Sequence, residues 1–164
     1  RQGGIDMSFA GLKTCKSMII TDCDAKSDTE VIARLCDLAQ EQNYVNEIFK
    51  EKILEREKEY PTGLATVVPI AIPHIHDGCL SSFFSIATFE TPVEFSALDG
   101  SDEKVKTQIV FLFGITDPSY QTAVLRKFSM IFQNEEMLNS YISIKDRDLL
   151  LDKLKQDLED YIIL

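Results

Sequence analysis

The segment VKTQIVFLFGI (Val105–Ile115) contains the strongest strand pattern in the sequence. Its centre, residues 109–113, is apolar at five consecutive positions. An uninterrupted apolar run of this length predicts a strand buried on both faces, as in a sheet that helices cover on both sides. Four shorter runs, rich in β-branched and aromatic residues and separated by proline and glycine, predict further strands at 64–68, 70–72, 82–89 and 93–95.

Helical patterns precede and follow these strands. Ser27 and Glu30 have the spacing of a capping box, which marks the start of a helix. Helices are predicted from there to about Gln42, from after Asn46 to the stop at 61–63, from Asp117 onward, and over 135–141 and 146–162, with 17–20 as a candidate edge strand. This order predicts an α/β fold in which a mixed β-sheet is flanked by helices on both faces, in a single layered domain.

Length and charge narrow the classes of function. The chain has 164 residues, which predicts one domain over 7–164, with residues 1–6 before Met7 interpreted as an expression scar. Seventeen basic and 27 acidic residues give a net charge of −10. This balance argues against nucleic acid or an anionic membrane as the main partner, because both reward clustered Lys and Arg. No apolar run approaches the roughly 18 residues that a membrane span needs.

The cysteines indicate a reducing compartment. They stand at positions 15, 23, 36 and 79 without a C-x-x-C pair, and the sequence after Met7 has no signal-peptide pattern. Because disulfides persist mainly in oxidising compartments, we expect reduced thiols and a cytoplasmic protein.

The segment PIAIPHIHDG (69–78) contains both histidines of the chain, His74 and His76. Pro73 restricts the backbone here, so His74 is expected at the stiff end of a strand, where a reactive group can be held in place. A neutral imidazole has a lone pair at physiological pH and can attack phosphorus or a carbonyl group, or bind a metal.

The residues alone leave several interpretations of this segment open. His74 and His76 could be polar turn residues without chemistry. They could instead bind a metal together with Asp77 and Cys79, although no H-E-x-x-H or paired C-x-x-C motif accompanies them. A Cys79–His nucleophile pair is a third interpretation, and nothing in the sequence indicates activation of that thiol.

Two linked motifs, EREKEYPTGL (55–64) and IAIPH (70–74), resemble the signature of the type-2 IIA domains of the bacterial phosphoenolpyruvate:sugar phosphotransferase system. This is the fructose/mannitol class. The sequence TPVEF (91–95) and the Asp99-Gly100 turn also fit, and the resemblance spans about 27–158. Within the family, the two motifs are most similar to the galactitol IIA branch.

The resemblance implies a phosphocarrier that needs no cofactor and no metal. His74 would accept a phosphoryl group from the carrier protein HPr and pass it to a cysteine of a IIB domain, which phosphorylates sugar entering through the membrane component IIC. Arg56 matches the family's arginine beside the active histidine, and its guanidinium can hold two phosphoryl oxygens. Thr62 is expected as a neighbour of the site. Fructose and mannitol members carry a second histidine, and here the matching position is Gln121, which also favours the galactitol-like branch.

Two alternatives from other classes remain open. One is a regulatory IIA-like module whose phosphorylation controls another protein, and the other is a small metal-binding domain that uses His74, His76 and Asp77. His76 matches no catalytic position, so we interpret it as a rim residue or as a partner that orients His74. For partner docking, the apolar candidates are Ile72, Ile75, Phe83 and Phe89, of which alternate ones are expected to face the core.

Overall fold

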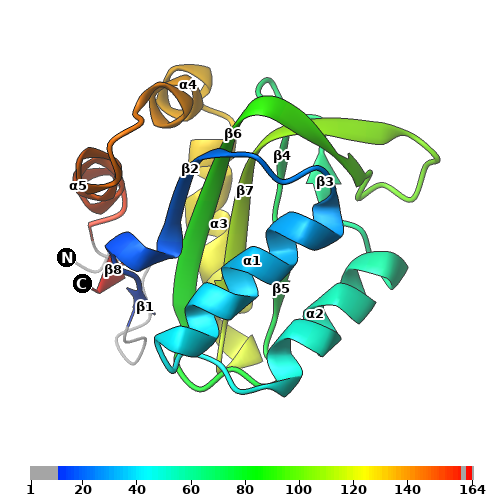
Figure 1. Cartoon of the computed structure of the whole chain (residues 1–164), viewed down its shortest axis with the longest axis vertical. Coiled ribbons are helices and arrows are strands. Elements are labelled where there is room, and N and C mark those ends of the chain that lie inside the picture. The colour runs from blue at the N-terminus through cyan, green and yellow to red at the C-terminus, as the bar shows by residue number, and fades with distance from the viewer. Residues whose placement is uncertain (1–10, 160–161, 164) are drawn as a thin grey trace.

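The structure is a computed structural model that describes residues 11–159 and the backbone of 162–163, so the predicted expression scar at 1–6 lies outside the described residues. Figure 1 shows the arrangement of its helices and strands. In chain order they are β1 (Leu12–Lys13), the 3-10 helix η1 (Lys16–Met18), β2 (Ile19–Cys23), α1 (Asp28–Glu41), α2 (Ile48–Glu59), β3 (Gly63–Leu64), β4 (Ile70–Ala71), β5 (His74–Ile75), β6 (Phe83–Ser96), β7 (Lys104–Gly114), the 3-10 helix η2 (Pro118–Tyr120), α3 (Gln121–Phe132), α4 (Glu135–Ser143), α5 (Arg147–Asp157) and β8 (Ile162–Ile163).

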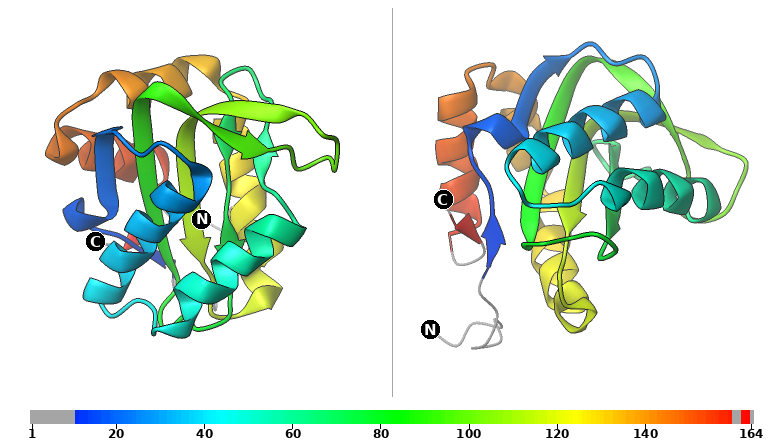
Figure 2. Two further views of the ribbon diagram at one scale, coloured as in Figure 1. Left: turned by 45° about the vertical axis from the view of Figure 1, so that its right-hand side comes forward. Right: turned by 60° about the horizontal axis from the view of Figure 1, so that its bottom comes forward.

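The strands form a mixed sheet with β7 in its interior, which confirms the predicted α/β fold. The order along the sheet is β3-β4-β7-β6-β1-β8, while β2 pairs with β6 and β5 pairs with β7. Strand β7 runs antiparallel to β6 and parallel to β4 and β5. Helices α1 and α2 cover one face and α3 covers the other, with α4 and α5 beside the edge formed by β2 (Figures 1 and 2).

Alternation along β7 explains why its centre is apolar throughout. Ile109, Phe111 and Phe113 pack into the cluster that includes α3, α4 and α5. Val110 and Leu112 pack into the opposite cluster, which includes α1 and α2. All five side chains are completely buried. One strand therefore supplies both cores, as a strand in the middle of a layered fold must.

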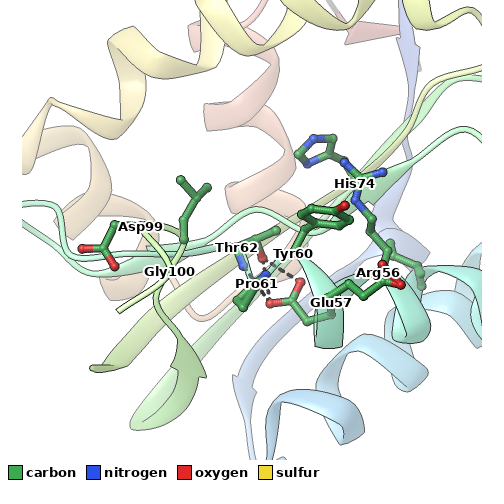
Figure 3. A pocket seen from close by; sticks show the side chains of 11 residues that line it. Arg56, Glu57, Tyr60, Pro61, Thr62, His74, Asp99 and Gly100 are labelled. Atoms are coloured by element: carbon green, nitrogen blue, oxygen red, sulfur yellow. Dashed lines mark hydrogen bonds between the residues drawn. The ribbon is translucent and has the colours of Figure 1, made fainter. Parts of the chain in front are cut away.

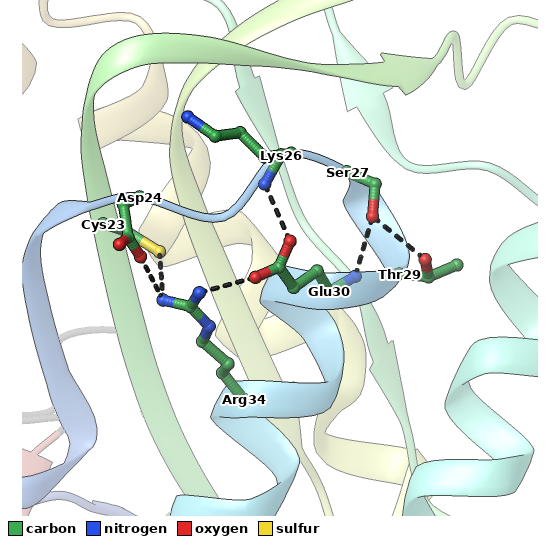
Figure 4. A network of polar contacts seen from close by, with 7 residues as sticks. All are labelled: Cys23, Asp24, Lys26, Ser27, Thr29, Glu30 and Arg34. Atoms are coloured by element: carbon green, nitrogen blue, oxygen red, sulfur yellow. Dashed lines mark hydrogen bonds and ion pairs between the residues drawn. The ribbon is translucent and has the colours of Figure 1, made fainter.

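The start of α1 is fixed by polar contacts (Figure 4). The Ser27 hydroxyl accepts the Glu30 N–H at 3.2 Å, and a Glu30 carboxylate oxygen accepts the Lys26 N–H at 2.9 Å. The second contact falls one residue before the cap, a small variation on the predicted capping box. Arg34 then joins Glu30 to Asp24, which ties the first turns of α1 to the segment after β2.

The predictions fail where the chain uses long-range pairing. The two strands predicted at 82–89 and 93–95 are one strand, β6, whose register shifts between Thr88 and Val93. Pro92 is accommodated at this irregularity, where a missing N–H breaks no regular ladder bond. The strand predicted at 64–68 reaches only Leu64.

The chain termini also differ from the predictions. The candidate strand at 17–20 begins instead at Ile19, because η1 occupies Lys16–Met18. The helix predicted to reach 162 ends at Asp157, and Ile162–Ile163 pair in parallel with β1 as strand β8. Pairing with a strand from the opposite end of the chain cannot be seen in a local helical pattern.

A hairpin formed by β6 and β7 extends beyond the rest of the sheet, and its tip turns back toward α2 (Figure 2). The Leu98 N–H donates to the carbonyl oxygen of Gly63 at 2.8 Å, and Gly63 pairs with Ala97. Position 63 must be glycine for this approach, because a Cβ there would lie 2.7 Å from the Ser96 carbonyl oxygen. The tip is thereby placed beside the turn that follows α2. Among the described residues, no helix is both long and apolar enough to span a membrane.

Candidate functional site

His74 lies at one end of the sheet, where backbone pairing between β5 and β7 holds it in position. It is the first residue of β5, opposite Phe113 of β7. The Phe113 N–H donates to the carbonyl oxygen of Pro73 at 3.0 Å, so the residue before the histidine is also fixed. The backbone of His74 is therefore part of a rigid strand, as the Pro73-His74 pair predicts.

The ring of His74 has a defined tautomer. Its Nδ1 lies 2.6 Å from the carbonyl oxygen of Ile72, and a carbonyl oxygen can only accept, so Nδ1 carries the proton. Nε2 therefore carries the lone pair. The side-chain amide of Gln121, the first residue of α3, lies 3.5 Å from this Nε2. The fold thus brings His74 and Gln121 together across 47 residues of sequence.

Burial and charge keep this imidazole neutral. Burial lowers the pKa of His74 from its ordinary value of 6.5, the hydrogen bond to Ile72 opposes that change, and the positive charge of Arg56 lowers the pKa further. A neutral ring at physiological pH is the form that can act as a nucleophile or accept a phosphoryl group.

The pKa shift gives a first prediction. In a titration followed by NMR, the ring protons of His74 are expected to show a midpoint below 6.5. Replacing Arg56 by methionine removes one cause of the shift, so the midpoint is expected to move upward while staying below 6.5, since burial remains. A midpoint at or above 6.5 in the unsubstituted protein would contradict this account.

A cavity of about 390 Å³ opens beside His74 (Figure 3). Its wall is built from three parts of the fold: the last turns of α2 with the turn after it, the histidine of β5, and the tip of the β6–β7 hairpin. The lining residues are Ile53, Arg56, Glu57, Glu59, Tyr60, Pro61, Thr62, His74, Leu98, Asp99 and Gly100. Both sequence motifs, 55–64 and 70–74, therefore meet at one cavity.

Arg56 contributes a positive charge to this cavity. Its guanidinium lies over the ring of Tyr60, with Cζ 4.9 Å from the ring centroid. Within residues 11–159, no carboxylate lies within ion-pair distance of it. Stacking on an aromatic ring holds the guanidinium without using its N–H donors, so they can bind an anion in the cavity.

Thr62 lines the cavity as predicted, but its polar groups are already bonded to a side chain that the sequence analysis did not single out. The Thr62 N–H donates to Glu57 Oε2 and its hydroxyl donates to Glu57 Oε1, each at 2.9 Å (Figure 3). Glu57 is 8% exposed. One signal could have found it: Phe49, Ile53 and Glu57 recur every four residues and share the buried face of α2.

Burial of Glu57 makes the free energy of unfolding depend on pH. Desolvation raises the pKa of its carboxyl group to about 7, against the opposing effect of the Thr62 hydrogen bonds, and the charge of Asp28 raises it slightly more. Between pH 4.5 and 7 the folded protein holds a proton that the unfolded chain has lost, so this group makes the fold less stable as pH rises through that window.

Replacing Glu57 by glutamine is expected to reduce the pH dependence of stability. The raised pKa corresponds to about 3 kcal/mol of unfolding free energy, present below pH 4.5 and lost above pH 7. The glutamine cannot ionise, so its unfolding free energy is expected to fall less between pH 5 and pH 8 than that of the unsubstituted protein. Denaturant titrations at both pH values measure this difference, and equal falls in the two proteins would refute it.

The remaining candidates near the histidine do not join this site. His76 Nδ1 lies 3.3 Å from a carboxylate oxygen of Asp77, and both side chains are about half exposed. In the part of the chain that the structure describes, the hydrogen-bond partners of the His74 ring are the Ile72 carbonyl and the Gln121 amide, and His76 is not among them. The Cys79 thiol donates to the carbonyl oxygen of Ser81, and burial raises its pKa to about 12, which disfavours a thiolate. The described part of the chain assembles no group of three metal-ligating side chains.

The proposed apolar docking residues were wrongly assigned. They are at most 7% exposed, because all four point into the two cores: Ile72, Ile75, Phe83 and Phe89. The apolar side chains at the rim of the cavity are instead Tyr60 and Leu98, which are 60% and 48% exposed.

Solved structures of known proteins share this fold. The IIA mannitol protein from Escherichia coli is 18% identical, with a TM-score of 0.70 over 87% of this chain and 99% of that one. The nitrogen regulatory protein IIA-Ntr from Neisseria meningitidis is 20% identical, with a TM-score of 0.71 over 87% and 96%. A complex of enzyme IIA and phosphorylated enzyme IIB for mannitol from E. coli matches at 17% identity, with a TM-score of 0.65 over 91% and 99%. At these identities the likeness shows the fold alone.

Sequence comparison identifies the family. The comparison with curated proteins finds no significant match. Residues 14–157, in contrast, match the profile of the family described as "Phosphoenolpyruvate-dependent sugar phosphotransferase system, EIIA 2". This match covers both motifs, both faces of the sheet and the cavity beside the histidine. The chain therefore belongs to the type-2 EIIA family and is a IIA phosphotransferase component of the phosphoenolpyruvate-dependent sugar phosphotransferase system.

Proposed function

We propose that His74 is the residue that carries the phosphoryl group and that Arg56 binds the oxygens of this group. One observation carries the proposal: the Nδ1 proton is committed to the Ile72 carbonyl at 2.6 Å, which leaves the Nε2 lone pair as the nucleophile. Arg56 lines the same cavity and has no carboxylate partner in the described residues. Phosphoryl transfer mainly needs such positioning and positive charge.

The reaction needs no proton transfer at His74. A bond forms between Nε2 and phosphorus while the bond from phosphorus to the donor's histidine nitrogen breaks, and the electron pair of that bond returns to the donor. The phosphorylated ring keeps its Nδ1 proton and becomes an imidazolium, which the Ile72 carbonyl stabilises. In the second step a cysteine thiolate attacks phosphorus, and the electron pair of the P–N bond returns to Nε2.

Gln121 would assist at the same atom. Its amide can donate to Nε2 in the resting protein and to a phosphoryl oxygen after transfer, but it cannot carry a proton. It stands at the first position of α3, where the helix end also favours negative charge. Thr62 has a different role, because its donors are bonded to Glu57.

The role of His74 as phosphoryl carrier implies a donor protein and an acceptor protein. The donor would be phospho-HPr and the acceptor a cysteine of a IIB component, with the membrane component IIC involved only indirectly and the reaction taking place in the cytoplasm. The IIB assignment is supported by the similar fold of a IIA protein that forms a complex with phosphorylated IIB. The net charge of −10 does not favour nucleic acid as a partner.

For the substrate, we propose a sugar or polyol of the galactitol-like or the fructose/mannitol class, with the galactitol-like branch favoured. The support is the resemblance of the motifs at 55–64 and 70–74 and the presence of glutamine rather than histidine at 121. Galactitol and mannitol IIB proteins offered in parallel would distinguish the two branches. Faster transfer to the mannitol IIB would contradict the galactitol assignment.

The test of the function uses radiolabelled phosphoenolpyruvate with enzyme I and HPr. We expect label on the chain that is lost in acid, as phosphohistidine is, and that leaves the chain when a cognate IIB is added. Label that no IIB removes would instead favour a regulatory module, a role consistent with the similar fold of IIA-Ntr. No label at all would contradict both.

A further inference from the structure

A buried carboxylate is hydrogen-bonded to the turn between α2 and β3. Glu57 lies one residue after Arg56 on α2, but its carboxylate points to Thr62 and accepts both the N–H and the hydroxyl of that residue (Figure 3). Three donor–acceptor contacts from two groups fix the turn against the end of the helix. A carboxyl group buried at this cost, where an apolar side chain would fit the pattern of α2, calls for a reason.

Hydrogen bonds of the backbone connect this turn to His74. The carbonyl oxygen of Thr62 accepts the Ile72 N–H at 3.2 Å, in continuation of the antiparallel pairing of β3 with β4. The carbonyl oxygen of Ile72 in turn accepts the Nδ1 proton of His74 at 2.6 Å. Three hydrogen-bonding steps, joined through the backbone of Thr62 and of Ile72, therefore connect the Glu57 carboxylate to the imidazole ring.

We propose that Glu57 is a positioning residue for phosphoryl transfer, because its buried carboxylate fixes the backbone that orients the ring of His74. This inference rests on the proposed function of His74. The carboxylate holds the turn, the turn holds the backbone of Ile72 through its N–H, and the Ile72 carbonyl selects the tautomer that leaves Nε2 unprotonated. The same contact keeps the carboxylate away from the guanidinium of Arg56, so this cation stays available to the phosphoryl group.

The charged groups around Glu57 do not pair with it, and Thr62 is its hydrogen-bond donor. Among the described residues, the charged groups nearby are Arg56 and Glu59 on the same helix, Asp28 at the start of α1, and Asp99 on the hairpin tip across the cavity. Asp28 repels the carboxylate, and Arg56 stacks on Tyr60. The hydrogen bonds from Thr62 are the contacts that stabilise Glu57 at this position.

The test measures the ring and the reaction separately. Nitrogen-15 chemical shifts of the His74 ring report the tautomer without any partner protein, and we expect Nδ1–H alone in the unsubstituted protein and a mixture of tautomers in Glu57→Ala. With phospho-HPr as donor, Glu57→Ala is expected to lower kcat at least about tenfold with KM unchanged, because misplacement of the nucleophile affects the transition state. Glu57→Gln keeps an acceptor for Thr62 and is expected to retain most of the rate.

Two further variants keep the test decisive. Glu55→Gln removes an exposed charge from the same helix and is expected to leave the tautomer and the rate unchanged. If Glu57→Ala does not fold, Thr62→Val removes the hydroxyl donor with little change in volume, and the same shift in tautomer and fall in kcat are expected, to a smaller extent.

A single tautomer and an unchanged kcat in the folded Glu57→Ala or Thr62→Val protein would overturn the inference while the role of His74 stands. Absence of label on the unsubstituted protein would instead overturn the proposed function.

Discussion

Replacing His74 by glutamine is expected to abolish phosphorylation of the chain completely. Glutamine occupies a similar volume, but its amide nitrogen has no available lone pair, so no P–N bond can form. The ring is held by one backbone hydrogen bond and by the Gln121 amide, and the described residues show no buried charge that depends on it. The variant should therefore fold. Incubation with labelled phosphoenolpyruvate, enzyme I and HPr measures the loss.

The second histidine provides the matched control. His76 lies two residues further along, is about half exposed and contacts Asp77 rather than the cavity. His76→Gln is therefore expected to accept label at the normal rate, and the two variants together separate the two histidines. Label retained by His74→Gln and lost from His76→Gln would reverse the assignment.

Replacing Arg56 by methionine is expected to lower the rate of phosphoryl transfer by about a thousandfold, the lower range for an arginine that stabilises a transferring phosphoryl group. The phosphoryl group carries negative charge on its oxygens, which the cavity must neutralise, and among the described residues Arg56 supplies the positive charge in the cavity lining. Lysine at this position keeps the charge but loses the planar fork and the stacking on Tyr60, so an intermediate rate is expected. Rapid-quench measurement of label transfer from phospho-HPr gives these rates.

Lys52→Met supplies the control for charge alone. Lys52 lies one turn earlier on α2, is exposed and does not line the cavity. Its loss changes the net charge of the chain by the same amount and is expected to change the transfer rate by no more than about twofold, the effect of a screened surface charge. Equal falls in the two variants would mean that Arg56 acts only through the overall charge.

Local pattern was sufficient to predict the parts of the fold that depend on local physics. The apolar run 109–113 predicted the interior strand, and the stop signal at 61–63 predicted the end of α2. It was insufficient where distant segments pair. β6 runs through Pro92 because β7 pairs with it on both sides of the irregularity, and Ile162–Ile163 form a strand because β1 is their neighbour.

For the candidate site too, the local sequence predicted some features and missed others. Proline before His74 and the motif around Arg56 were visible as sequence, and the cavity brings both together. Glu57 was not singled out, because a glutamate on a charged helix is ordinarily solvated, and its spacing of four residues from Ile53 was the one sign that it faces the core. The tautomer of His74 also required the structure, since it depends on the direction of the Ile72 carbonyl group.

The pairing of β1 with β8 has a practical consequence. Leu12 lies beside Ile162 and Lys13 beside Ile163, so the chain enters and leaves the described fold on adjacent strands. Because the two strands run parallel, a linker must cross the gap of about 5 Å between them and also run back along the short paired segment, at about 3.3 Å per residue, which a short peptide can do. Residues 12–163 therefore suit insertion as a unit into a surface loop of a host protein, or rearrangement by circular permutation, with β6 and β7 standing between the junction and β5.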